Sequence, residues 1–134
     1  SRPQFNLSAD GGSNYNVTKT TTFFASFNDE AGSSGAVSYS TGGDLAQGTG
    51  AQRLGGDTDA DNDTAMSGTL HLFQPSSTTF TKHFLSRTNQ VSTAYSQDCF
   101  VSGYGNTTSA VNAVQFSQSS GTIQSGTIKM YGVV

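Results

Sequence analysis

The densest group of potential metal ligands is the acidic run from Asp57 to Asp63, in which every second residue is an aspartate. Alternating carboxylates are the hard oxygen ligands that calcium prefers. A calcium loop of the EF-hand type is excluded, because Asn62 stands where that loop needs glycine and Gly68 stands where it needs glutamate. We expect a solvated surface loop without a metal, and a looser surface calcium site is the alternative that the sequence leaves open.

The two histidines and the single cysteine are the next candidates for chemistry. His71 and His83 have no further histidine or cysteine at metal-ligand spacing. Cys99 lies between Asp98 and Phe100, which do not supply the positive charge that activates a thiolate. We therefore expect both histidines at a sheet surface or a subunit contact, and Cys99 in a buried or half-buried packing position.

The sequence contains no arrangement that indicates catalysis. It has no nucleophile-elbow pattern, and serine is so frequent that any choice of a nucleophile would be arbitrary. Asp29 and Glu30 are adjacent, which does not place two carboxyl groups across a sugar ring. We expect no catalytic residue, no metal and no cofactor.

Tyrosines are the best candidates for a binding function. Tyr15, Tyr39, Tyr95 and Tyr104 stand among small polar residues, and exposed rings in such surroundings are platforms for protein or sugar contacts. The alternative is that each ring packs at the edge of a sheet. We take Tyr95 and Tyr104 as the predicted binding residues.

The composition indicates a small folded β-protein. Hydrophobic residues make up 33% of the 134 residues and charged residues 11%, and Ser, Thr, Gly, Asn and Gln fill the difference. Disorder is disfavoured, since the net charge is only −3 and nine Phe and five Tyr are available for a core. Helix formers are scarce and no stretch has helical apolar periodicity. The length predicts one domain, residues 1–134.

Charge and hydropathy exclude two classes of partner. The six basic residues are scattered singly and the sequence pI is about 4.9, so no concentrated positive field is available for nucleic acid. No apolar run approaches the ~18–20 residues that cross a bilayer, and there is no signal-peptide pattern. We expect a soluble protein. It begins with Ser1 rather than Met, which suggests that an N-terminal piece has been removed.

Alternating apolar and polar residues, punctuated by glycine-rich turns, predict about eight to nine strands. In Met66–Phe73, Leu70 and Leu72 share one face with Met66, and in the last strand Ile128 and Met130 share one face. The predicted strands are 4–7, 15–27, 36–40, 51–54, 66–73, 80–87, 91–103, 111–118 and 123–133.

Three segments are predicted to connect strands. The turn 10–14 is predicted to join the first two strands as a hairpin, and residues 88–90 are predicted to be a turn. The stretch 47–64 is predicted to be one long exposed loop around a short strand. The pattern as a whole is typical of an antiparallel β-sandwich that is jelly-roll-like.

Several segments resemble a family of phage-encoded virion structural proteins with a jelly-roll-like C-terminal domain, which are fibre-like or decoration proteins. The most specific is Ser119–Val133, a hairpin that ends in the motif Ser-Gly-Thr-Ile-Lys-Met-Tyr-Gly. Others are Ser67–Pro75, Ser109–Phe116 and the turn Asp10–Ser13. Domains of this family tend to carry one more strand before the Gly-Gly turn than this chain does.

The resemblance implies a sandwich on the virion surface, with other virion proteins as partners and a homo-oligomer such as a trimer as its assembly. It transfers no catalytic or binding residue. The function we expect is a tail-fibre or receptor-binding type domain that contacts a host cell-surface glycan. The alternative is a capsid decoration protein, of the cement or head-fibre type. A capsule depolymerase and a cellular carbohydrate-binding module are the remaining alternatives.

Overall fold

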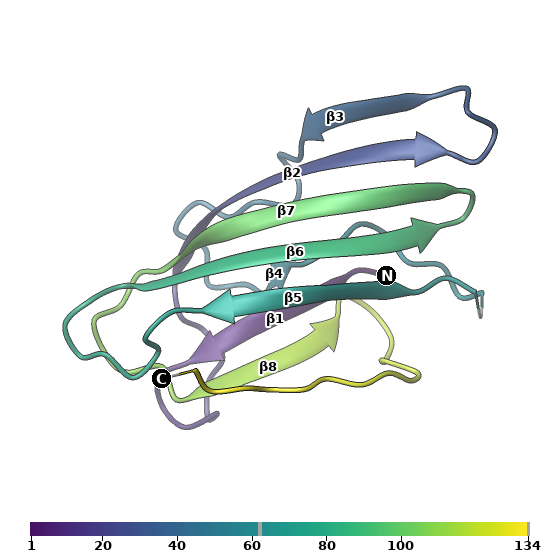
Figure 1. Cartoon of the computed structure of the whole chain (residues 1–134). Helices are drawn as coiled ribbons and strands as arrows, with labels where there is room; N and C mark the ends of the chain where they lie inside the picture. Colours follow the sequence, from purple (N-terminus) through teal and green to yellow (C-terminus); the bar gives the residue numbers. More distant parts are fainter. Residues whose placement is uncertain (62, 134) are drawn as a thin grey trace.

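A computed structural model of the chain, which describes residues 1–61 and 63–133, is all-β with two antiparallel sheets (Figure 1). A five-stranded sheet has the order β3-β2-β7-β6-β5, and a three-stranded sheet has the order β4-β1-β8. The eight strands are β1 Pro3–Ser8, β2 Lys19–Asp29, β3 Gly35–Tyr39, β4 Gln52–Arg53, β5 Met66–Leu72, β6 Lys82–Ser92, β7 Tyr95–Gly105 and β8 Ala113–Gln118.

The predicted β-sandwich is therefore confirmed, whereas this strand order does not establish the finer prediction of a jelly roll. The described residues include no helix, and thus none that is long and apolar enough to cross a membrane.

Apolar side chains from both sheets meet in one core. Phe5 of β1 lies edge-on to Phe84 of β6, with ring centroids 5.0 Å apart, and both rings are buried. The other buried members of the cluster are Leu7, Val17, Phe23, Ala25, Leu54, Cys99, Val101 and Val111. Burial recurs at every second position throughout β6 and from Lys19 to Ala25 of β2, as the two-residue period of a strand requires.

The predicted turn at residues 88–90 is wrong, because these residues lie inside β6. Their polar character has a different cause. Thr88 Oγ1 donates to the Leu54 carbonyl at 2.6 Å, while Gln90 accepts from Gly56 N at 2.9 Å and donates to the Asp57 carbonyl at 3.0 Å. Buried backbone groups need such partners. The chain turns at Thr93, which has a φ of 54°.

The prediction of one exposed loop from 47 to 64 is wrong for its middle part. Gln52, Leu54, Gly55 and Gly56 are buried, and β4 joins the three-stranded sheet. Gln52 accepts a hydrogen bond from Thr21 and donates to the Gly43 carbonyl. The segment belongs to the interior because its polar groups are paired there.

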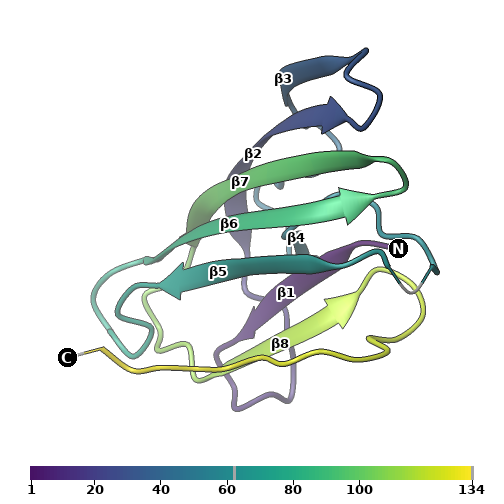
Figure 2. The same cartoon turned by 45° about the vertical axis from the view of Figure 1, so that its right-hand side comes forward.

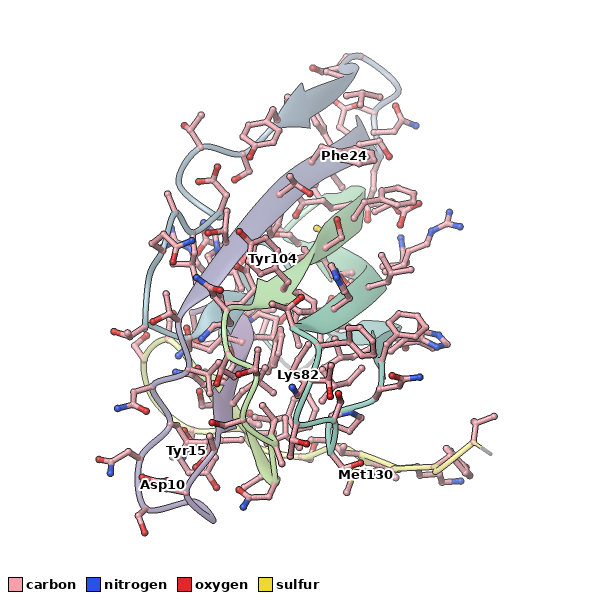
Figure 3. The ribbon with its side chains drawn as sticks, turned by 90° about the vertical axis from the view of Figure 1, so that its left-hand side faces the viewer. Asp10, Tyr15, Phe24, Lys82, Tyr104 and Met130 are labelled. Atoms are coloured by element: carbon pink, nitrogen blue, oxygen red, sulfur yellow. The ribbon has the colours of Figure 1, made fainter. Side chains whose placement is uncertain are left out.

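The predicted hairpin between the first two strands is also wrong. β1 and β2 belong to different sheets, and β1 pairs with β4 and β8 instead. The intervening turn does form. Asp10, labelled in Figure 3, accepts hydrogen bonds from Asn14 N and Nδ2, each at 2.8 Å. These bonds lower the pKa of Asp10 from 3.8 to about 2.

The predicted last strand, residues 123–133, is wrong as a paired strand. The segment is extended and lies at the surface, but it joins neither sheet. In Figures 1 and 2 it is the yellow ribbon that follows β8.

Candidate functional site

A group of aromatic side chains lies on the outer face, which we define as the face of the five-stranded sheet that points away from the three-stranded sheet. Directly paired residues of an antiparallel sheet project from the same face. The register therefore places one row of side chains across all five strands. This row is Tyr39, Phe24, Phe100, Arg87 and Thr69.

Three members of this row form a clamp, defined as Phe24, Phe100 and Arg87. The rings of Phe24 and Phe100 are stacked, with centroids 4.8 Å apart and planes 4° from parallel. The Arg87 guanidinium lies over the ring of Phe100, with its central carbon 4.7 Å from the ring centroid. A cation in that position is attracted by the electron-rich face of the ring.

Asp98 fixes the Arg87 end of the clamp. Its carboxylate accepts hydrogen bonds from Arg87 Nε at 3.2 Å and Nη2 at 2.8 Å. These bonds raise the pKa of Arg87, so the guanidinium stays charged. Of the outward-facing strand residues, only Asp98 carries a carboxylate, and it is occupied by this ion pair.

Two adjoining shallow hollows lie on the outer face. The first, of about 350 Å³, is lined by the clamp together with Thr69, His71 and Leu85. The second, of about 360 Å³, is lined by Phe73, His83, Leu85 and Tyr104. Leu85 is 54% exposed and belongs to both hollows, so they form one continuous surface. A surface of this shape fits an extended ligand better than a small molecule that needs enclosure.

The structure does not bring the two predicted binding residues together. Tyr104 lies on the outer face in the second hollow, 6.0 Å from the ring of His83 (Figure 3). Tyr95 begins the same strand but projects from the inner side, where it packs edge-on against Phe27 at 5.9 Å. Nine steps along a strand reverse the face, and this separates the two tyrosines.

The other tyrosines differ in position. Tyr39 is 52% exposed at one end of the clamp row, and its hydroxyl donates to Asp44 at 2.6 Å, which raises the pKa of Tyr39. Tyr15 is half-buried beside the turn at residues 10–14, away from the strands of the outer face.

Sequence reasoning missed the clamp itself. Phe24 follows the buried Phe23, and Phe100 stands between the buried residues Cys99 and Val101. Alternation alone would have placed both rings outward, but only the pairing of β2 with β7 brings them into contact. The prediction for the histidines is confirmed, since His71 and His83 are exposed on β5 and β6. Cys99 is buried as predicted, and burial raises the pKa of its thiol.

The acidic run does not form a cation site in the part of the chain that the structure describes. Asp57 pairs with Arg2 at 2.7 Å, and Asp59 accepts a hydrogen bond from Thr93. No three acidic, histidine or cysteine side chains converge among residues 1–61 and 63–133. Asn62, within this run, lies outside the described residues.

Comparison of the chain with protein-family models, curated proteins and solved structures finds no match.

Proposed function

We propose that this chain is a bacteriophage virion surface protein of the tail-fibre or receptor-binding type, and that its outer face binds a glycan of the host cell. The observation that carries the binding part is the clamp. Phe24, which is 43% exposed, presents an apolar ring that its stack on Phe100 holds in place, while Arg87 covers Phe100. Rings that are already ordered lose little entropy on binding, which favours affinity.

Hydrogen-bonding groups beside the rings support a sugar rather than an apolar ligand. Thr22 and Ser102, whose hydroxyls lie 3.0 Å apart, occupy the next row of the outer face. A sugar ring has apolar C–H faces and polar edges, so it needs flat rings with hydroxyls next to them. The two adjoining hollows provide this combination.

The virion part of the proposal is supported by the motif resemblance, strongest in Ser119–Val133. On this proposal the protein acts at the virion surface, with other virion proteins as partners and within a homo-oligomer such as a trimer.

An array of bacterial surface polysaccharides tests the proposal. Phe100→Ala removes both the ring that stacks on Phe24 and the ring over which the Arg87 guanidinium lies. We expect about tenfold weaker binding, equivalent to ~1.4 kcal/mol. The matched control is Val37→Ala, because Val37 is exposed on the same sheet but lines neither hollow. Binding that Phe100→Ala leaves unchanged, or no binding to polysaccharides of the correct host, would contradict the proposal.

Tyr104 and Tyr95 test which side of β7 is used. Tyr104→Ala should weaken binding, because its ring lines the second hollow. Tyr95→Ala should leave binding unchanged, because its ring packs on Phe27 on the inner side. If Tyr95→Ala weakened binding and Tyr104→Ala did not, the binding surface would lie at the rim of the sandwich and not on the outer face.

The alternative is a capsid decoration protein. The unpaired segment that follows β8 favours it, since an extended segment is suited to holding subunits together. Antibody labelling of particles separates the two functions. Label at the tail supports host attachment, and label over the whole head supports decoration.

A further inference from the structure

The segment Thr127–Val133 has the pattern of a strand but no partner in the described chain. Ile128 and Met130 alternate with Thr127, Lys129 and Tyr131, as in a strand with one apolar face. Ile128 is 63% exposed and Met130 is 84% exposed. None of the residues from 121 to 133 makes a hydrogen bond with the rest of the described residues. Seven consecutive residues thus leave their backbone groups open.

The connection to β8 leaves this segment outside both sheets of its own sandwich. Residues 119–126, which connect β8 to the segment, could span roughly 26 Å when extended. Gly126, just before the segment, has a φ of 147°, a conformation that side chains disfavour. In Figure 3, where Met130 is labelled, the end of the yellow ribbon projects from the body.

A sheet edge of matching length is open on the same molecule. β5 is the last strand of the five-stranded sheet and has seven residues, the same number as Thr127–Val133. Its inward side chains Leu70 and Leu72 pack against the core but are only half-buried. An uncovered edge with incompletely buried apolar residues is a template for another strand.

We propose that Thr127–Val133 of one copy of this chain adds to the β5 edge of a second copy. Ile128 and Met130 then face inward and cover Leu70 and Leu72, while Lys129 and Tyr131 continue the outer face. The five-stranded sheet becomes six-stranded, with one strand supplied by a neighbour. This inference does not rest on glycan binding.

The occupant is a second copy because the chain carries both halves of the contact. The segment and the edge agree in length and in their apolar alternation. Every copy donates one strand and accepts one, so the exchange builds an oligomer of this chain without a second kind of protein. Backbone hydrogen bonds supply affinity in this mode, and the inward side chains fix the register.

Sedimentation of the whole chain over a range of concentrations is the first test. We expect an oligomer for the parent and a monomer for Ile128→Asp, because a carboxylate cannot enter the core. The matched control is Lys129→Asp on the opposite side of the segment, which should remain oligomeric. A parent that is monomeric at every concentration, or an oligomer that Ile128→Asp leaves intact, would overturn the proposal.

Cross-linking with a short bismaleimide identifies the edge. Chains carrying Thr69→Cys, at the middle of β5, are mixed with chains carrying Lys129→Cys, and we expect a cross-linked pair. Gln115→Cys on β8 replaces Thr69→Cys as the control and should give none. The native Cys99 is buried and does not compete.

Cross-linking to Gln115→Cys instead, or only within a single chain carrying both cysteines, would refute the exchange onto β5. Glycan binding by an unmodified chain that is monomeric at every concentration would leave the proposed glycan binding standing while this inference fails.

Discussion

Replacing Lys19 with methionine should change how stability depends on pH. Lys19 is fully buried at the start of β2. Its Nζ donates to Asn6 Oδ1 at 2.5 Å and to the Val17 carbonyl at 2.7 Å. The described residues place it in no ion pair. Burial lowers the pKa of Lys19 from 10.5 to about 8, because the charged form is poorly solvated there.

The size and sign of the effect follow from this shift. The difference between 10.5 and about 8 corresponds to at most about 3.5 kcal/mol, at ~1.4 kcal/mol per pKa unit. Below pH 8 the lysine is protonated in both states, so the folded state bears the full cost of the buried charge. Between pH 8 and 10.5 the unfolded state binds a proton that the folded state does not, and the free energy of unfolding rises with pH.

Urea unfolding followed by circular dichroism at a series of pH values measures this. Relative to the parent, Lys19→Met should be more stable at pH 7 and should lose that advantage as the pH approaches 10.5. The Asn6 oxygen keeps a partner in the variant, since it also accepts from Leu7 N at 2.9 Å. The control is Lys129→Met on the exposed segment, which should follow the parent. If the curves of Lys19→Met and the parent run parallel, burial of a charged Lys19 is not the cause.

Two further predictions concern the turn and the core. Asp10→Asn should reduce acid sensitivity in urea unfolding. The hydrogen-bonded carboxylate stabilises the fold above pH 3.8, and this contribution is lost as the pH falls towards 2, so an equal pH dependence in the variant would contradict the assignment. Phe84→Ala should cost about 3–5 kcal/mol in the free energy of unfolding, because it leaves a cavity beside Phe5, whereas a loss below about 1 kcal/mol would show that the two sheets do not share this core.

Some elements could be predicted because their local pattern and their tertiary surroundings agree. β5 was found with Met66, Leu70 and Leu72 on one face, and the structure turns these residues towards the core. β3 and β8 were also placed within a few residues. In these elements each apolar side chain meets other apolar side chains, so local alternation carries the information.

Other elements could not be predicted because their polar residues have distant partners. Thr88 and Gln90 have the composition of a turn, yet they are buried in β6. They are buried there because they bind the backbone of residues 54–57, more than thirty positions earlier. The proposed binding surface also depends on residues that are distant in the sequence. Tyr104 could be selected from the sequence, whereas the clamp of Phe24 and Phe100 required the register of two strands far apart in the chain.

The sequence by itself determined that this chain forms short strands and turns, because a two-residue period and glycine-rich corners act within a few residues. It also determined that the six basic residues are scattered singly along the chain. Only the tertiary structure decided which strands pair, and therefore that β1 leaves β2 for the other sheet and that residues 123–133 join neither. Strand pairing depends on which backbone groups are left open elsewhere in the fold, and no local pattern contains that information.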